Sequence, residues 1–239
     1  MTQKIIIVGA TSGMGRRLAE IYAEKNWKVG ITGRRQNLLD ELTQKHPGKV
    51  ESECFDVKIP ECISKMNLLV EKLGGMDVLL ISAGGGDVSN ELSWELDKWM
   101  VETNVNGFIQ IANWGFNFFV RQGYGHLAVI SSIASNRGNR EAPAYSASKA
   151  FQSVYFEGLA LKAARLNNKI IVTCIEPGFV ATKMAKSDKL FWVVPVDKAA
   201  RQIISAIEKK KRKVYISRRW RLIAWILKNL PYSIYRRIV

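Results

Sequence analysis

The sequence has few cysteines and no long apolar run, and both absences limit what the protein can be. Its 239 residues include three cysteines, Cys54, Cys62 and Cys174, which are odd in number and widely separated. Such spacing argues against a disulfide framework or a zinc site and fits a reducing, cytoplasmic compartment. No stretch approaches the ~18 consecutive apolar residues of a membrane-spanning helix. The chain also reaches Gly9 too early for the apolar segment of a secretory signal peptide, so we expect no exported form.

Acidic side chains are nearly absent from the end of the chain. The sequence has 36 Lys and Arg against 21 Asp and Glu, a formal net charge of +15, and 47% of its residues are hydrophobic. That balance is typical of a folded globule. Residues 208–239 contain 11 basic residues and a single acidic one, Glu208, and therefore hold +10 of the +15. The remainder of the chain has a nearly ordinary charge, and the basic end needs an explanation of its own.

Short β-branched runs alternate with longer helical stretches along most of the chain. Continuous apolar strands of this kind are typical of a parallel sheet that is covered on both faces. The expected fold is α/β: a Rossmann-type, doubly wound parallel sheet of seven strands in a three-layer α/β/α arrangement. We expect one domain over 1–217 and a basic amphipathic extension over 218–239. The predicted strands are 4–8, 29–32, 50–55, 78–82, 127–131, 170–175 and 214–217, with helices such as 13–25 and 143–166 between them.

A glycine-rich turn follows the first predicted strand and opens a helix. Gly9, Gly13 and Gly15 punctuate this turn, which also contains Thr11 and Ser12. In that context glycines let backbone N–H groups and a helix N-terminus approach a pyrophosphate. The alternative is a tight strand-to-helix turn without a ligand.

The second predicted strand ends in two arginines where NAD-preferring sites usually place a carboxylate. Arg34 and Arg35 follow Gly33 directly. Guanidinium groups at this position favour the 2′-phosphate of NADP through charge-assisted contacts. The alternative is a pair of solvated arginines at a helix start, although cations there oppose the helix dipole. We therefore predict NADP(H), with Arg34 as the first choice and Ser12 or Arg35 assisting.

Tyr145 and Lys149 stand four residues apart on one predicted helix, so their side chains share a face. A free tyrosine has a pKa near ~10 and needs a nearby cation to release its proton readily at neutral pH. Taken alone, the pair is equally typical of an amphipathic helix surface. Ser132 lies thirteen residues before Tyr145 at the end of a predicted strand, and Asn104 occupies a helix interior where asparagine is poorly suited.

In the order of these motifs the sequence resembles the short-chain dehydrogenase/reductase family over residues 3–217. The resemblance also includes Asp56-Val57 after the third strand, Ala83-Gly84 after the fourth and the segment from Pro177 to Thr182 after the sixth. It implies that Tyr145 donates the proton to a carbonyl and that Ser132 binds the substrate oxygen. Lys149 would hold the nicotinamide ribose and lower the pKa of Tyr145, and Asn104 would support a water relay to Lys149.

The resemblance also implies a set of cofactor contacts and no metal. Asp56 would meet the adenine amino group, while Gly178 and Val180 would contact the nicotinamide amide. The full predicted set is Gly9, Thr11, Ser12, Gly13, Met14, Gly15, Arg34, Arg35, Asp56, Val57, Ala83, Gly84, Tyr145, Lys149, Pro177, Gly178, Val180 and Thr182.

The expected activity is NADPH-dependent reduction of a ketone or aldehyde to an alcohol by a homo-oligomer, a dimer or tetramer. Phe179 and the apolar run 190–193 suggest an apolar substrate. A long-chain 3-oxo lipid and a 3-oxoacyl group on a carrier protein both stay open. A non-catalytic NADP-binding scaffold or sensor with an interacting tail is the alternative.

Residues 218–230 predict an amphipathic helix that ends before Pro231. Its apolar residues span an arc of about 160°, with Arg221, Lys228 and Asn229 opposite and Trp225 at the border. Three placements stay open: packing on the domain as a lid, packing on a second copy, and peripheral contact with an anionic membrane, to which the run 209–213 would contribute. No groove-reading or base-stacking module accompanies the charge, so we expect no nucleic acid partner. The apolar arc contains Trp220, Leu222, Ile223, Ile226, Leu227 and Leu230.

Overall fold

The short apolar segments form one parallel sheet in the computed structural model, which describes residues 2–87, 91–166, 168–182 and 191–238. Within these residues the sheet has seven strands in the order β3-β2-β1-β4-β5-β6-β7, and every neighbouring pair is parallel. The order reverses between β1 and β4, where such folds bind ligands at the carboxyl ends of the strands. The predicted Rossmann-type architecture is confirmed. The strands are β1 (Lys4–Val8), β2 (Lys28–Gly33), β3 (Val50–Cys54), β4 (Val78–Ile81), β5 (Tyr124–Ile130), β6 (Lys169–Pro177) and β7 (Lys213–Ile216).

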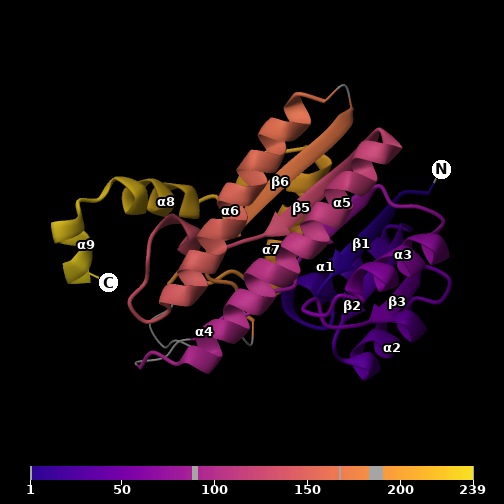
Figure 1. The fold of residues 1–239 in the computed structure, drawn as a ribbon, viewed down its shortest axis with the longest axis horizontal. Helices are drawn as coiled ribbons and strands as arrows, with labels where there is room; N and C mark the ends of the chain where they lie inside the picture. The colour runs from indigo at the N-terminus through magenta and orange to yellow at the C-terminus, as the bar shows by residue number, and fades with distance from the viewer. Residues whose placement is uncertain (1, 88–90, 167, 183–190, 239) are drawn as a thin grey trace.

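Helices cover both faces of the sheet and bury two separate apolar clusters (Figure 1). In β1, Ile5 and Ile7 belong to one cluster, whereas Ile6 and Val8 belong to the other. Because successive side chains of a strand point to opposite faces, a strand covered on both sides must be apolar throughout. One face carries α1 (Gly13–Glu24), α2 (Gln36–Lys45) and α7 (Val196–Glu208), and the other carries α3 (Cys62–Leu73), α5 (Phe108–Gln122) and α6 (Pro143–Ala164).

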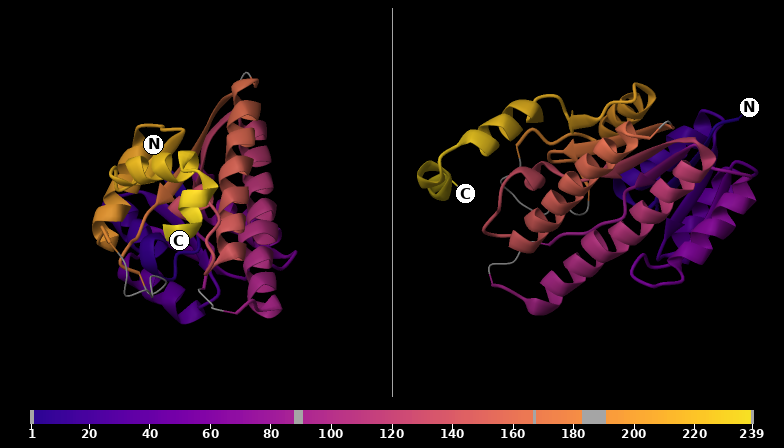
Figure 2. Two further views of the ribbon diagram at one scale, coloured as in Figure 1. Left: turned by 90° about the vertical axis from the view of Figure 1, so that its left-hand side faces the viewer. Right: turned by 45° about the horizontal axis from the view of Figure 1, so that its top comes forward.

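Three shorter segments lie near the carboxyl edge of the sheet. Helix α4 (Trp94–Val101) continues through a π-helical segment, η1 (Glu102–Gly107), into α5, and a 3₁₀ turn, η2 (Ile133–Asn136), follows β5. Beyond β7, α8 (Trp220–Asn229) and α9 (Tyr232–Ile238) project from one end of the molecule (Figures 1 and 2). None of the described helices combines the length and apolar character needed to cross a membrane.

The tail, defined here as residues 218–238, is attached to the domain by only part of its apolar arc. Trp220 and Ala224 are 2% and 1% exposed and pack against Ile133. Leu222 and Ile226, by contrast, are 59% and 37% exposed. The sequence indicated one continuous apolar face on this helix. In the structure the domain covers only the Trp220 side of that face, and its other apolar side chains stay exposed.

Candidate active site

A cleft of about 1000 Å³ opens at the carboxyl ends of β1, β2 and β4. Twelve of the predicted cofactor residues line it, whereas Gly15, Tyr145, Lys149, Pro177, Gly178 and Val180 lie outside its lining. The lining members of the predicted set are Gly9, Thr11, Ser12, Gly13, Met14, Arg34, Arg35, Asp56, Val57, Ala83, Gly84 and Thr182. The strand-order reversal thus brings together residues from five separate loops.

The glycine turn between β1 and α1 fits a bound pyrophosphate. Gly9 has φ +89°, and a Cβ there would lie 2.6 Å from the backbone of Ala83, so only glycine is accommodated. The Ser12 side chain makes no capping hydrogen bond to α1. The first N–H groups of α1 are therefore donors for an anion, with the helix dipole adding to the attraction.

Both arginines after β2 reach this cleft, but they hold different partners. Arg35 donates from Nε to the Thr11 hydroxyl at 3.2 Å and from Nη2 to the Ser12 hydroxyl at 2.9 Å. Arg34 pairs with the Asp56 carboxylate at 3.6 Å, and its side chain is 57% exposed. The two guanidinium groups thus line the cleft at the end of β2, with the Asp56 carboxylate beside Arg34.

Asn104 fixes the glycine-rich loop after β4. It lies in η1 and is fully buried; its Oδ1 accepts from the Gly85 N–H at 2.9 Å and its Nδ2 donates to the Gly85 carbonyl at 2.7 Å. The wider π turn lets the main-chain carbonyl of Asn104 accept a hydrogen bond from outside the helix, here from Gln152 at 2.9 Å. The prediction of an asparagine inside a helix is therefore correct, and the π turn explains why it is tolerated.

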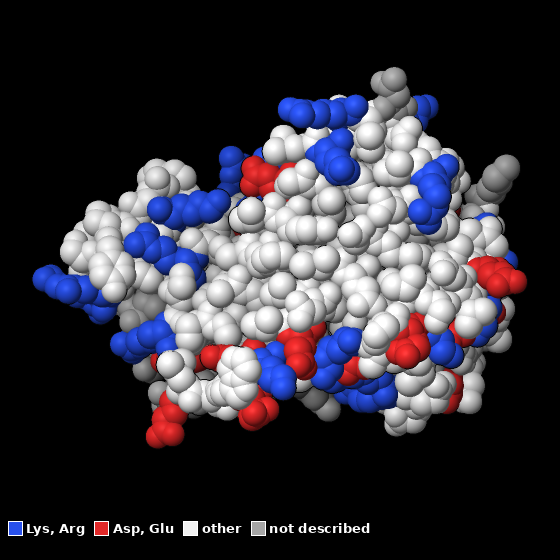
Figure 3. All heavy atoms as spheres, viewed as in Figure 1, with Lys and Arg blue, Asp and Glu red and all other residues white. Residues whose placement is uncertain are grey.

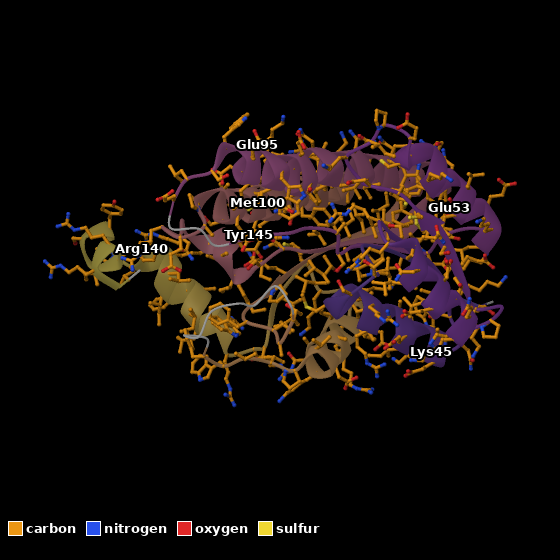
Figure 4. All side chains as sticks on the ribbon, turned by 90° about the horizontal axis from the view of Figure 1, so that it is seen from below. Lys45, Glu53, Glu95, Met100, Arg140 and Tyr145 are labelled. Carbon is orange, nitrogen blue, oxygen red and sulfur yellow. The ribbon has the colours of Figure 1, made fainter. Side chains whose placement is uncertain are left out.

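Tyr145 and Ser132 meet at the end of β5. Ser132 precedes η2, and its hydroxyl lies next to that of Tyr145. Burial raises the pKa of Tyr145, and the neighbouring Ser132 hydroxyl opposes the rise. A Cβ at Gly86 would lie 2.4 Å from the Tyr145 ring, so the glycine loop allows the ring to pack directly on the backbone. Figure 4 shows Tyr145 between the tail at one end of the molecule and the strand carrying Glu53 at the other.

The Lys149 ammonium lies beside the Tyr145 ring and donates to two other acceptors. Its ammonium lies 5.8 Å from the centre of the Tyr145 ring and donates to the Ile130 carbonyl at 3.2 Å and to Gln152 Oε1 at 3.0 Å. Burial lowers the pKa of Lys149 to about 8. The family resemblance implies that Lys149 lowers the Tyr145 pKa. In the structure burial is the largest influence on both groups, raising the pKa of Tyr145 and lowering that of Lys149.

Gln152 was missed by the sequence analysis, although it lies one turn after Lys149 on α6. It is fully buried and connects the Asn104 carbonyl to the Lys149 ammonium. Gln152 therefore links the main chain of Asn104 to Lys149, and the implied water relay stays a prediction. The one signal that could have revealed the role of Gln152 is its position, three residues after Lys149 on the buried side of the helix.

We expect two Gln152 substitutions to shift the pH dependence of turnover in opposite directions. Gln152→Leu removes an acceptor from the Lys149 ammonium and lowers the lysine pKa further, whereas Gln152→Glu places a carboxylate there and raises it. The alkaline fall of kcat/KM should begin near pH 8 in the parent protein. The pH at which the fall begins should be lower in Gln152→Leu and higher in Gln152→Glu. Equal pH profiles in all three proteins would contradict this role of Gln152.

Two further residues support the loop that carries Ser132. Glu176 is fully buried at the end of β6, where it accepts from Ser153 at 2.9 Å and from Asn136 at 3.1 Å and pairs with Lys213 at 2.6 Å. Arg137, which follows η2, donates to the carbonyls of the tail. Neither residue belongs to a motif that the sequence displays.

The end of β6 is shared between the cleft and the tail. Thr182 reaches the glycine turn, since a Cβ at Gly13 would lie 3.5 Å from its methyl group. A Cβ at Gly178 would lie 2.0 Å from the Trp220 indole, so the tail packs directly on this glycine. Val180 forms a bridge with Val194. Among the described residues no group of three or more His, Cys, Asp or Glu is placed to hold a metal, and all three cysteines are free.

A comparison with protein families identifies the family to which this chain belongs. Residues 3–190 match the family model described as short chain dehydrogenase. The chain belongs to the short-chain dehydrogenase family. The assignment covers the glycine turn, the Asn104 loop, Ser132, Tyr145 and Lys149 in one ordered match.

Relatives and solved structures of this short-chain dehydrogenase agree with the assignment. A Myxococcus xanthus protein described as an uncharacterized oxidoreductase is 35% identical over 190 residues, which are 77% of this chain and 74% of the relative. A Mycobacterium tuberculosis protein with the same description is 33% identical over 219 residues, 87% of this chain and 85% of the relative. A variant of actinorhodin polyketide ketoreductase with NADPH is 28% identical, with a TM-score of 0.71 over 95% of this chain and 90% of that one. The 3-ketoacyl-(acyl-carrier-protein) reductase from Brucella melitensis with NADH, 18% identical, shares the fold with a TM-score of 0.81 over 90% of this chain and 98% of that one.

Proposed function

We propose that this short-chain dehydrogenase uses NADPH to reduce the carbonyl of an apolar ketone or aldehyde to an alcohol. The observation that supports the proposal best is the adjacent Ser132 and Tyr145 pair, with the Lys149 ammonium beside the tyrosine ring, next to a cleft large enough for a dinucleotide. When bound, the nicotinamide supplies the hydride. Side chains of this protein bind the carbonyl, donate the proton and stabilise the phenolate that remains.

Tyr145 is the proton donor in this proposal. Ser132 donates a hydrogen bond to the carbonyl oxygen, and the Tyr145 hydroxyl passes its proton to the same oxygen as charge develops there. The resulting phenolate is stabilised by the Lys149 ammonium, which needs to remain charged for that purpose. Because Lys149 is buried with a lowered pKa, this support weakens above pH about 8.

The preference for NADPH over NADH rests on the charges at the end of β2. Arg34 and Arg35 both line the cleft, and the Arg35 guanidinium is already oriented by the hydroxyls of Thr11 and Ser12. A 2′-phosphate in this position would take the place of Asp56 as the partner of Arg34. A guanidinium–phosphate pair is charge-assisted and is favoured over a weak, partly exposed ion pair.

We expect Arg34→Ala to weaken NADPH binding by about 10- to 100-fold, as a charged hydrogen bond contributes roughly 1.5–3 kcal/mol. NADH binding should stay within about twofold, because NADH lacks the phosphate that Arg34 contacts. Fluorescence titration of each nucleotide measures the two affinities. Arg212→Ala, which removes an exposed arginine paired with Glu157, is the matched control. An equal loss for NADPH and NADH would contradict the proposed role.

An apolar substrate is favoured by the aromatic cluster at the end of β6. Phe179 contacts Phe191 and Trp220 with ring centres 5.8 and 5.2 Å apart, and Trp192 adjoins them. Leu190, also expected near the substrate, lies outside the described residues. Such rings bind hydrocarbon chains better than charged groups. NADPH oxidation with ketones of increasing chain length tests the proposal; no turnover of any of them would contradict it.

A further inference from the structure

Helix α8 has a second apolar face, which points away from the domain. Trp220, Ala224 and Leu227 pack inward, and at 100° per residue Leu222, Trp225 and Ile226 fall on the opposite side. Leu222 is 59% exposed, and Trp225 is 64% exposed. We call the exposed apolar side chains of the tail the tail surface: Leu222, Trp225 and Ile226 on α8 and Tyr232 and Ile234 on α9. The exposed rings of Phe191 and Trp192 lie beside the start of α8.

Basic side chains surround the tail surface. The tail contains Arg218, Arg219, Arg221, Lys228, Arg236 and Arg237, all exposed, and no acidic residue follows Glu208. In Figure 3 the end of the molecule that carries α8 and α9 shows blue and white spheres, while red ones lie over other elements below it. Arg219 also stacks over Trp192 with its guanidinium carbon 5.8 Å from the ring centre.

The tail is fixed to the domain, so its outward face stays outward. Arg137 donates to the carbonyls of Leu227 at 2.9 Å and Leu230 at 2.7 Å, at the C-terminal end of α8. Its guanidinium also lies 4.6 Å from the centre of the Tyr235 ring, and the Tyr235 hydroxyl donates to the Gly138 carbonyl at 2.6 Å. These contacts hold α8 and α9 against the loop after η2 rather than over the nucleotide cleft.

We propose that the tail surface binds an anionic lipid membrane as a peripheral, non-spanning contact. Exposed tryptophan, tyrosine and aliphatic side chains bordered only by cations are the pattern of an interfacial helix. A second copy fits less well, because a two-fold interface would bring the same cations together. Nucleic acid binding would explain the charge but not the outward aliphatic side chains of Leu222, Ile226 and Ile234.

The run 209–213 is not part of this surface. It ends at Lys213, the first residue of β7, whereas the tail follows the last residue of that strand, so the two lie at opposite ends of β7. Within the run, Arg212 pairs with Glu157 and Lys213 with the buried Glu176. From the sequence, both groups of cations were candidates for one membrane contact; the contact proposed here uses the tail cations alone.

The experiment is sedimentation of the full chain with vesicles. We expect binding to phosphatidylcholine vesicles that contain phosphatidylserine, weaker binding at high salt, and little binding to phosphatidylcholine alone. Arg221→Gln with Lys228→Gln should weaken partitioning about 30-fold, a factor of roughly five for each cation near an anionic surface. Trp225→Ala should weaken it about tenfold through the loss of buried apolar area.

Matched controls are available elsewhere on the surface. Trp94 is 73% exposed at the start of α4, but its neighbours Glu95 and Asp97 are acidic, so Trp94→Ala should leave vesicle binding unchanged. Lys162→Gln with Arg165→Gln removes two cations near the C-terminal end of α6 and should likewise have no effect. Trp225→Ala should also keep its turnover of a water-soluble ketone, which separates membrane binding from catalysis.

Three outcomes would overturn the proposal. The first is no sedimentation of the intact protein with the anionic vesicles. The second is an equal loss of binding in the tail variants and in their controls. The third is a dimer in analytical ultracentrifugation that dissociates on Trp225→Ala, which would show that a second copy covers the tail surface. None of these depends on NADPH turnover, so the reductase proposal stands or fails separately.

Discussion

Tyr145→Phe is expected to lower kcat for NADPH-dependent ketone reduction by about 10³-fold, within the range that a positioned general acid contributes. The substitution removes only the hydroxyl, which lies next to Ser132 in the structure. The ring remains and still fills the space against Gly86. Folding and NADPH affinity should therefore change little, and the loss should appear in kcat rather than in cofactor binding.

The measurement is NADPH oxidation under saturating cofactor, combined with a fluorescence titration of NADPH. Tyr155→Phe is the matched control. Tyr155 stands on the same helix, but its ring packs against Phe108 and Phe151. If Tyr145→Phe retained full turnover, the protein would not use this phenol as its proton donor, and the non-catalytic scaffold would become the better interpretation.

Lys149→Met is expected to abolish turnover and, at the same time, to stabilise the fold at neutral pH. Burial lowers the Lys149 pKa from 10.5 to about 8, which corresponds to a cost of about 3 kcal/mol for the charged form. Methionine avoids this cost but leaves the Ile130 and Gln152 oxygens without a donor, a loss of about 2 kcal/mol at about 1 kcal/mol for each oxygen. The net gain in the free energy of unfolding is therefore about 1 kcal/mol.

The pH dependence of that gain follows from the sign of the shift. Between pH about 8 and 10.5 the unfolded chain binds the lysine proton and the folded chain does not, so the parent protein gains stability as pH rises through this window. Below it the cost of burial is fully present. Urea unfolding of both proteins should show the advantage of Lys149→Met shrinking toward pH 10.5.

Lys162→Met provides the control, since Lys162 lies on α6 at an exposed position. We expect no pH-dependent difference for it. A Lys149→Met protein less stable than the parent at neutral pH, or one whose offset stays constant with pH, would show that the buried ammonium is stabilised by its acceptors and is not a cost.

The sequence was sufficient for the architecture and for locating the candidate site residues along it. Runs such as 4–8 are apolar at every position, which only a strand buried on both faces requires, and the glycine turn follows directly from its place between a strand and a helix. Ser132, Tyr145 and Lys149 were predicted from their spacing, and the fold places them together at the end of β5 and on the adjacent α6.

Contacts between distant segments could not be predicted in this way. Gln152 matters because it lies between two groups, Asn104 and Lys149, whose approach depends on how α6 packs against η1. The π turn in η1 also changes the helix phase by one residue, so a periodicity of 3.6 cannot be continued from α4 into α5. For the tail, periodicity identified apolar positions but not which of them the domain covers.

The Arg137 hydrogen bonds link the stability of the loop that carries Ser132 to the position of the tail. Arg137 stands five residues after Ser132, and two of its hydrogen bonds end on carbonyls of the tail. An outward movement of α8 would remove both acceptors and release the segment that carries the serine. Thermodynamic coupling of this kind is reciprocal: if lipid contact changes the affinity of the site for its ligands, those ligands change the affinity for lipid by the same factor. With such coupling, the affinity of the tail for a bilayer would depend on whether the cleft is occupied.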